Sequence, residues 1–260
     1  MAEIVAIANQ KGGVGKTTTA VNLSACIAAL GNRVLLVDID PQGNSTSGLG
    51  VDKTQVAQST YEILIENLPL SEVIRPTMVA GLDLAPSHIR LAGAEIELVS
   101  LLARETILSR RFAEVSDQYD YILMDCPPSL GLLTLNALTA ASKLLVPIQC
   151  EFFALEGLSQ LMNTVQLVRQ SLNPRLSVEG VVLTMYDART NLSNQVGAEV
   201  KRYFKEKVYQ TVIPRNVRLS EAPSYGLPVT LYDPTCTGAE AYRSLAREFV
   251  AQCGQKEGRA

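Results

Sequence analysis

Five short runs of apolar residues recur along the chain, at 3–8, 33–38, 120–125, 143–149 and 178–184. Val, Ile and Leu dominate them, and their apolar positions are nearly continuous rather than alternating. Continuous runs of this length are typical of strands in a parallel sheet, because such strands are buried on both faces. The pattern therefore predicts five strands of a parallel sheet.

Stretches with helical spacing separate these runs, at 17–30, 91–115, 131–141, 155–171 and 192–206. Strands that alternate with helices indicate βαβ units, so we expect the α/β class: a doubly wound, mainly parallel β-sheet with helices on both faces. Residues 44–80 are rich in Ser, Thr, Gln and Pro, which predicts surface loops and short helices. We expect one domain over 1–260, with a frayed C-terminal tail from about 254 to 260.

Composition limits the class of protein further. Hydrophobic residues make up 47% of the 260 positions and charged residues 19%, which indicates a buried core and argues against disorder. The net charge of −3 argues against a constitutive polycation that binds nucleic acid. No apolar run reaches the roughly 18 residues of a membrane span, so we expect a soluble, cytoplasmic protein. Five widely spaced cysteines are expected to be reduced, buried side chains.

A glycine-rich segment, Q-K-G-G-V-G-K-T-T at 10–18, follows the first strand and precedes an Ala-rich helix. Glycines let successive backbone N–H groups turn toward one anion, and the helix N-terminus adds partial positive charge. In such a loop Lys16 reaches the outer phosphates and the Thr17 hydroxyl can ligate Mg²⁺. The segment departs from the ordinary pattern, which has Gly where this chain has Gln10. The residues expected to bind nucleotide are Lys11, Gly12, Gly13, Val14, Gly15, Lys16, Thr17 and Thr18.

Acidic residues end two of the expected strands. Asp125 ends Y-I-L-M-D, and Asp38 and Asp40 end V-L-L-V-D-I-D. Carboxyl ends of parallel strands meet at one edge of a sheet, so these carboxylates are expected beside the phosphate loop. Asp125 could hold Mg²⁺, directly or through its water, and either Asp38 or Asp40 could orient the attacking water.

Three motifs, K-G-G-V-G-K-T-T, V-D-I-D-P-Q-G-N and D-C-P-P-S-L-G, resemble those of the deviant Walker A ATPases of the ParA/MinD group, which are P-loop NTPases. Two later segments, L-T-M-Y-D-A-R-T-N-L and V-I-P-R-N-V-R-L-S-E-A-P-S-Y-G-L-P, are similar to the chromosomal ParA (Soj) branch. The resemblance extends from residue 3 to about 250. It implies a slow hydrolase that converts ATP to ADP and phosphate and that a partner stimulates.

The resemblance also assigns roles at the nucleotide. It implies that Lys11 crosses an ATP-dependent dimer interface to touch the nucleotide of the partner subunit. Lys16 and Thr17 match the phosphate-binding lysine and the Mg²⁺ ligand of the family. Asp40 matches an aspartate needed for hydrolysis, so the implied catalytic residues are Asp40, Lys11 and Lys16. Asp125 matches the Walker B aspartate at the metal, and Pro214 and Asn216 match a loop near adenine.

Basic residues are concentrated in 168–220, where nine Lys and Arg stand against four Asp and Glu. The pattern alone favours a solvated basic helix face over a DNA site. The resemblance favours DNA, because Arg189 and Arg218 match arginines that family members use to bind DNA without sequence preference. Phosphate contacts are weak and screened by salt, so a dimer, which doubles their number, should bind better than a monomer.

The resemblance finally implies partners and a place in the cell. We expect a homodimer in the ATP state that binds non-specific double-stranded DNA in the bacterial cytoplasm, at the nucleoid. A ParB-type partner would stimulate hydrolysis and release the DNA, in the partitioning of a chromosome or plasmid. No membrane association is expected.

Two alternatives share the phosphate loop. A MinD-like membrane-associated positioning ATPase would end in an amphipathic helix with a basic face, whereas helix 238–252 mixes Glu240 and Glu248 with Arg243 and Arg247. That composition favours a packing helix. An iron–sulfur electron carrier would need cluster cysteines placed between subunits, but Cys126 directly follows Asp125 and Cys150 ends a strand.

Overall fold

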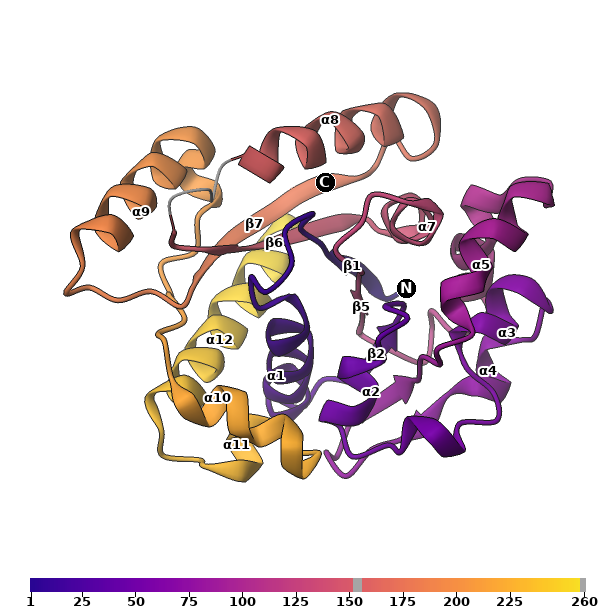
Figure 1. The fold of residues 1–260 in the computed structure, drawn as a ribbon, viewed down its shortest axis with the longest axis horizontal. Coiled ribbons are helices and arrows are strands. Elements are labelled where there is room, and N and C mark those ends of the chain that lie inside the picture. The colour runs from indigo at the N-terminus through magenta and orange to yellow at the C-terminus, as the bar shows by residue number, and fades with distance from the viewer. Residues whose placement is uncertain (152–155, 258–260) are drawn as a thin grey trace.

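Seven strands form one sheet in the computed structural model, which describes residues 1–151 and 156–257, with side chains for 1–151 and 158–253. The sheet order is β3-β4-β2-β5-β1-β6-β7, and only the β3–β4 pair is antiparallel (Figure 1). The five expected strands are all present and the mainly parallel, doubly wound fold is confirmed. The strands are β1 (Glu3–Ile7), β2 (Val34–Asp38), β3 (Arg75–Pro76), β4 (Leu82–Ala85), β5 (Tyr121–Asp125), β6 (Lys143–Gln149) and β7 (Ser177–Thr184).

Helices cover both faces of this sheet. Successive side chains of β1 alternate between the faces, so that Val5 and Ile7 lie in one hydrophobic cluster and Ala6 in the other. The first cluster includes α1 (Lys16–Ala29), α11 (Val229–Tyr232) and α12 (Thr237–Glu257). The second includes α3 (Thr60–Ile65), α5 (Leu91–Glu97), α6 (Ile107–Ala113), α7 (Leu132–Ala140), α8 (Glu156–Ser171) and α9 (Asn191–Phe204).

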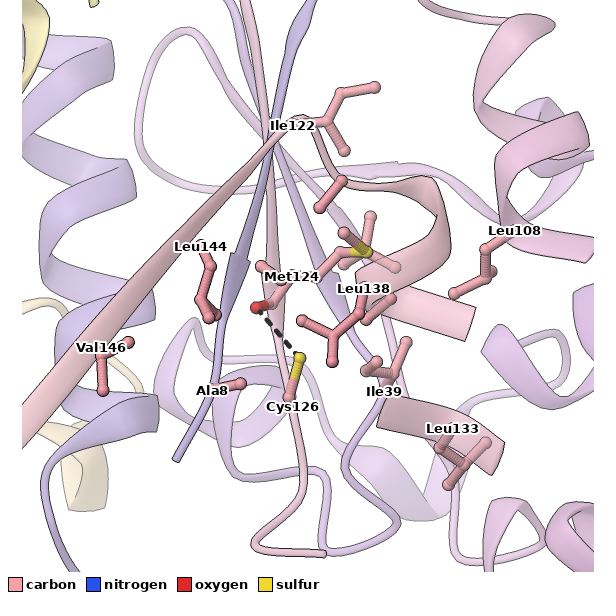
Figure 2. Close-up of a cluster of buried hydrophobic side chains, with 14 of the residues drawn as sticks. Ala8, Ile39, Leu108, Ile122, Met124, Cys126, Leu133, Leu138, Leu144 and Val146 are labelled. Atoms are coloured by element: carbon pink, nitrogen blue, oxygen red, sulfur yellow. Dashed lines mark hydrogen bonds between the residues drawn. The ribbon is translucent and has the colours of Figure 1, made fainter. Parts of the chain in front are cut away.

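Figure 2 shows the part of the second cluster that surrounds Met124 and Cys126. Side chains of α7 pack around Ile122, Met124 and Cys126. Leu108 of α6 lies in the same cluster. The Cys126 thiol donates to the Met124 carbonyl at 3.8 Å, and burial raises the pKa of this thiol. Four of the five cysteines are buried as expected, but Cys236 is only half-buried.

The expected helix 91–115 is broken into four short pieces. Helix α5 continues as a 3₁₀ turn at Leu98–Ser100, and a second turn at Arg104–Thr106 precedes α6. Between them Ala103 has a φ of 52°, and Leu102 is 94% exposed. The break redirects the chain so that α6 buries Ile107, Leu108 and Phe112, a gain in packing that outweighs the local helix pattern.

Residues 44–80 form the expected loops and short helices, namely α2 (Asn44–Gly48), a 3₁₀ turn at Lys53–Gln55, α3 and α4 (Leu70–Val73). Strand β3 also lies in this region and is not predicted by the pattern, because two residues carry no periodicity. Helix α3 begins at a capping box, in which Ser59 accepts from the Tyr61 backbone N–H and Glu62 accepts from the Ser59 backbone N–H.

The terminal helix α12 is a packing helix, as its mixed charges indicated. Its Tyr242 and Phe249 are buried in the first cluster, and the rings of Phe249 and Tyr121 are 5.7 Å apart. The helix ends at Glu257, beyond the expected end at 252, so part of the expected tail is helical and 258–260 lie outside the described residues. Among the described residues no helix is long and apolar enough to cross a membrane.

Gly180 of β7 gives a test of this packing. A Cβ built there would lie 2.3 Å from Cε2 of Tyr209, whose side chain is fully buried and has no room to move. We expect Gly180→Ala to lower the free energy of unfolding by about 1–3 kcal/mol, measured by urea denaturation. The matched control is Gly197→Ala in α9, where the nearest contact is an ordinary 3.4 Å to Leu183. That change should be neutral or stabilising by up to about 1 kcal/mol, and equal effects at the two positions would contradict the packing described.

Candidate nucleotide and cation site

The phosphate loop joins β1 to α1 at the carboxyl edge of the sheet (Figure 1). Gly13 and Gly15 adopt positive φ angles of 74° and 86°, which turn the backbone around a small space. Asn9 holds the base of the loop, because its amide donates to the Pro147 carbonyl at 2.7 Å and its oxygen accepts from the Lys11 backbone N–H at 3.0 Å. From β7, the Thr184 hydroxyl donates to the Val14 carbonyl at 2.8 Å. The loop is therefore fixed by the ends of β6 and β7.

Lys16 begins α1 and is 6% exposed. Its ammonium donates to the Lys11 carbonyl at 2.9 Å, within the loop itself. Burial lowers the pKa of Lys16, and the nearby Asp125 and Asp40 carboxylates act in the opposite direction. The ammonium is thus held inside the loop, where an anion in the loop would meet it.

Asp125 ends β5 and is fully buried, directly across from Ile7 of β1 and Asp38 of β2. The Ser45 hydroxyl donates to its Oδ2 at 2.8 Å. Its Oδ1 is also buried, and no hydrogen bond of standard geometry reaches it from the described residues. Burial raises the pKa of Asp125, while the Ser45 and Thr17 hydroxyls act to lower it.

These oxygens fit a hard cation. Mg²⁺ in proteins takes one or two carboxylates together with phosphate and water oxygens, rather than a cage of protein ligands. Within the described residues no group of three or more His, Cys, Asp or Glu is placed to hold a metal. Asp125 Oδ1 and the Thr17 hydroxyl, which interacts with the Asp125 carboxylate, are oxygens of the kind that this sparser set uses.

Asp40 lies just beyond β2 and is 7% exposed. Its Oδ1 accepts from the Gln42 backbone N–H at 2.9 Å, and its carbonyl accepts from the Ser87 hydroxyl at 2.7 Å. Its backbone N–H donates to Asp38 Oδ1 at 3.2 Å. The structure therefore brings Asp40 to the same edge as Lys16 and Asp125. Asp38 is fully buried and accepts from two backbone N–H groups, whereas the Asp40 carboxylate acts on the pKa of Lys16.

A cavity of about 250 Å³ connects the phosphate loop to the segment before α10 (Val217–Glu221). Its lining includes Gly15, Thr18, Thr184, Pro214 and Asn216. The segment is held there because the Tyr186 backbone N–H donates to the Ile213 carbonyl and residues 186 and 214 form an isolated parallel bridge. Pro214 and Asn216 thus line the same cavity as Gly15 and Thr18 of the phosphate loop. The Asn216 amide oxygen caps α10, accepting from the Arg218 backbone N–H at 2.8 Å.

The ammonium of Lys11 pairs with a carboxylate, whereas that of Lys16 bonds to the backbone of the loop. The Lys11 ammonium forms an ion pair with Glu151, just beyond β6, and the two side chains are 30% and 39% exposed. In the single chain, therefore, this lysine is paired internally at the rim of the site.

Two glycines bring the loop after α2 against the segment after α10. A Cβ at Gly226 would lie 2.6 Å from the Gly50 Cα, so only glycine permits this approach of the two backbones. The loop that follows α2 and the turn that follows α10 are thus in direct contact.

Arg189 and Arg218 lie outside the nucleotide cavity. Arg189, just before α9, is 88% exposed and makes a bidentate pair with Asp187, which lowers the pKa of Asp187 to about 2. Arg218 of α10 pairs with Glu221 at 2.8 Å and Asp233 at 3.2 Å. Helices α9 and α10 lie on the same side of the view in Figure 1. Both arginines are exposed at the surface, as a DNA contact requires, and each has a carboxylate partner.

Four residues of the site were not singled out from the sequence: Asn9, Ser45, Thr46 and Thr184. They act through short-range hydrogen bonds between segments distant in sequence, for which a single chain carries little signal. The consecutive hydroxyls of Ser45 and Thr46, soon after the D-I-D-P-Q-G-N segment, were the only available hint.

Comparison with known proteins identifies the family of this chain. The family model described as an AAA domain matches residues 2–178. The chain is 62% identical to the sporulation initiation inhibitor protein Soj of Bacillus subtilis, over 96% of this chain and 99% of that protein. It is 52% identical to the chromosome partitioning protein ParA of Caulobacter vibrioides strain NA1000, over 99% and 97%.

A solved structure shares the fold of this chain. It is the crystal structure of cobyrinic acid a,c-diamide synthase from Mycobacterium smegmatis with bound ADP and magnesium. The two chains are 39% identical, and the match covers 100% of this chain and 97% of the M. smegmatis chain. The TM-score is 0.87. The phosphate loop, the acidic strand ends and these full-length matches lead to one conclusion. The chain belongs to the ParA/Soj family of chromosome-partitioning ATPases.

Proposed function

We propose that this chain binds ATP and Mg²⁺ in the phosphate loop and hydrolyses ATP slowly, as a single ATPase domain. The observation that carries the proposal is the meeting of Lys16, Asp40 and Asp125 at one edge of the sheet, beside a cavity that reaches Asn216. The M. smegmatis structure with bound ADP and magnesium supports the choice of ligands.

Each residue has a part in this scheme that its position supports. The loop from Lys11 to Thr18 offers backbone N–H groups to the phosphates, and Lys16 donates to the outer ones. Thr17 and Asp125 would hold Mg²⁺, which offsets charge on the phosphate oxygens. Asp40 orients a water for attack on the terminal phosphate. Positioning and electrostatics carry such chemistry, so no strong base is needed.

ATP then controls pairing of two chains. Two nucleotides that face each other bring many negative charges together, and Lys11 of each chain offsets that repulsion when both are ATP. Hydrolysis removes the terminal phosphate and its contacts, so the pair separates. Lys11 must leave Glu151 of its own chain to reach the nucleotide of the partner subunit.

We propose that the ATP dimer binds double-stranded DNA without sequence preference through Arg189 and Arg218, at the bacterial nucleoid. A ParB-type partner stimulates hydrolysis and so releases the DNA, which partitions a chromosome or plasmid. Both arginines are held by carboxylates in the single chain, so one pair of contacts should be weak. A dimer doubles them, which is why retention should need ATP.

Asp40→Ala tests the role of Asp40 in turnover. The variant should bind ATP and form ATP-dependent dimers, because Lys16 and the loop are intact, while hydrolysis measured by phosphate release falls to background. Asp52→Ala, an exposed carboxylate that caps the nearby 3₁₀ turn, is the matched control and should hydrolyse ATP normally. Loss of ATP binding in Asp40→Ala would place this residue in a different role.

Arg189→Glu combined with Arg218→Glu tests the DNA surface. DNA retention should be abolished and ATP-dependent dimers preserved, because both side chains lie outside the nucleotide cavity. The single changes to Ala should each lower the slope of log affinity against log salt, by about 1 for each phosphate that the protein no longer neutralises. Arg33→Glu, which breaks a surface pair with Asp120 beside the amino end of β2, is the control. Unchanged DNA binding in the double variant would reject this surface.

Lys16→Ala tests whether nucleotide gates DNA binding. Without the buried ammonium the phosphates lose their main cation, so both ATP binding and DNA retention should disappear. Retention measured with ATP, ADP and no nucleotide across a salt series gives the comparison. DNA retention by Lys16→Ala in the absence of nucleotide would contradict the gating.

A further inference from the structure

Asp38 is buried beside the site but has no part in the scheme above. It ends β2, its side chain is fully buried, and in the parallel register it lies opposite Asp125. Two adjacent buried carboxylates are costly, because desolvation and mutual repulsion both disfavour their charges. A neutral side chain of similar size would fit this position at less cost to stability. The carboxylate must therefore make contacts that a neutral side chain could not make.

The contacts of Asp38 are of this kind. Its Oδ1 accepts from the Asp40 backbone N–H at 3.2 Å, and its Oδ2 accepts from the Thr46 backbone N–H at 2.8 Å and from the Thr46 hydroxyl at 2.7 Å. One carboxylate therefore binds both Asp40, at the start of the loop after β2, and Thr46 of α2, at its far end. The span and curvature of that loop depend on two acceptor oxygens in a fixed geometry.

Ser87 closes these contacts into a ring. Its backbone N–H donates to the Thr46 hydroxyl oxygen at 2.9 Å, and its own hydroxyl donates to the Asp40 carbonyl at 2.7 Å. The ring thus passes from Asp38 to Thr46, to Ser87, to Asp40 and back to Asp38. Asp38, Thr46 and Ser87 are each 0% exposed, so water does not compete for these bonds.

The ring holds two residues of the site. Asp40 is a member of it, and Ser45, next to Thr46 in the chain, donates to Asp125 at 2.8 Å. The consecutive residues Ser45 and Thr46 thus bind the two buried carboxylates, one each. A shift of Thr46 would move Ser45 and Asp40 together relative to the phosphate loop.

We propose that Asp38 is a positioning residue for ATP hydrolysis, which sets the place of Asp40 through the ring that it forms with Thr46 and Ser87. This inference rests on the proposed role of Asp40 in turnover. Asp38 does not touch the nucleotide in this scheme, so it should govern the rate of hydrolysis and leave ATP binding nearly unchanged.

Two substitutions break the ring from opposite sides. Asp38→Asn keeps the size of the side chain but has one acceptor oxygen, so either Asp40 or Thr46 faces an NH₂ group instead of an acceptor. Thr46→Val keeps the shape and removes the hydroxyl that joins Asp38 to Ser87. Thr46→Ser keeps that hydroxyl and is the matched control.

We expect kcat to fall about 10- to 100-fold in Asp38→Asn and Thr46→Val, the range for a small misplacement of a catalytic group. KM for ATP should change less than about threefold, since the interaction matters only in turnover. Thr46→Ser should keep the kcat of the unmodified chain. The double variant should be no slower than the slower single variant, because both changes break the same ring.

Three controls separate this role from a general structural one. Gly180→Ala loses stability through a contact in β7 and should keep its kcat at a temperature where it is folded. A titration with Mg²⁺ should give the same half-saturating concentration in Asp38→Asn as in the unmodified chain. Asp40→Ala is assayed alongside, so that a failure of the Asp40 assignment shows in that variant itself.

Several results would overturn the inference. These are an unchanged kcat in Asp38→Asn when Asp40→Ala is inactive, a loss in Thr46→Ser as large as that in Thr46→Val, or a change confined to KM. A higher Mg²⁺ requirement in Asp38→Asn would likewise overturn it, because Asp38 would then act through the Asp125 cation site.

Discussion

The cost of burying charged side chains at the carboxyl edge of the sheet is the constraint on which the rest of this structure depends. Lys16, Asp38 and Asp125 are buried there, and burial shifts each of their pKa values toward the neutral form. Such groups persist only where donors and acceptors compensate them. The hydroxyls of Ser45 and Thr46, the Lys11 carbonyl and the backbone N–H groups provide that compensation. The loops that carry these partners are therefore held where a nucleotide would need them.

The parts of the fold that follow from burial on both faces could be predicted from the sequence. All five continuous apolar runs are strands, and Lys16, Asp40 and Asp125 lie at one edge because parallel strands end there. The break at Ala103 could not be predicted, since it depends on where Phe112 finds space against neighbouring elements. The ring of Asp38, Thr46 and Ser87 was also beyond prediction, because Thr46 and Ser87 are 41 residues apart. Asp38 was recognised as a candidate, but only its contacts separate its role from that of Asp40.

Charged side chains at the surface form exposed ion pairs, unlike the buried groups at the edge of the sheet. The segment 168–220 is basic in sequence, yet Arg189 and Arg218 are each paired with carboxylates, one of them in bidentate geometry. Exposed pairs of this kind contribute little to stability, so they can be exchanged for phosphate at small cost. The two arginines of this acidic chain are thus exposed and only weakly held by their partners. Lys11 is held in a similar way, because it pairs with Glu151 and both side chains remain partly exposed to solvent.

The contact between Gly50 and Gly226 has a mechanical consequence. Side chains that touch can turn to absorb a shift, but two backbones without Cβ atoms can only move together or separate. The loop after α2 and the turn that ends at Gly226 therefore keep this close spacing only while both positions are glycine. A side chain at Gly226 would push the Gly50 backbone away, and with it the loop that follows α2.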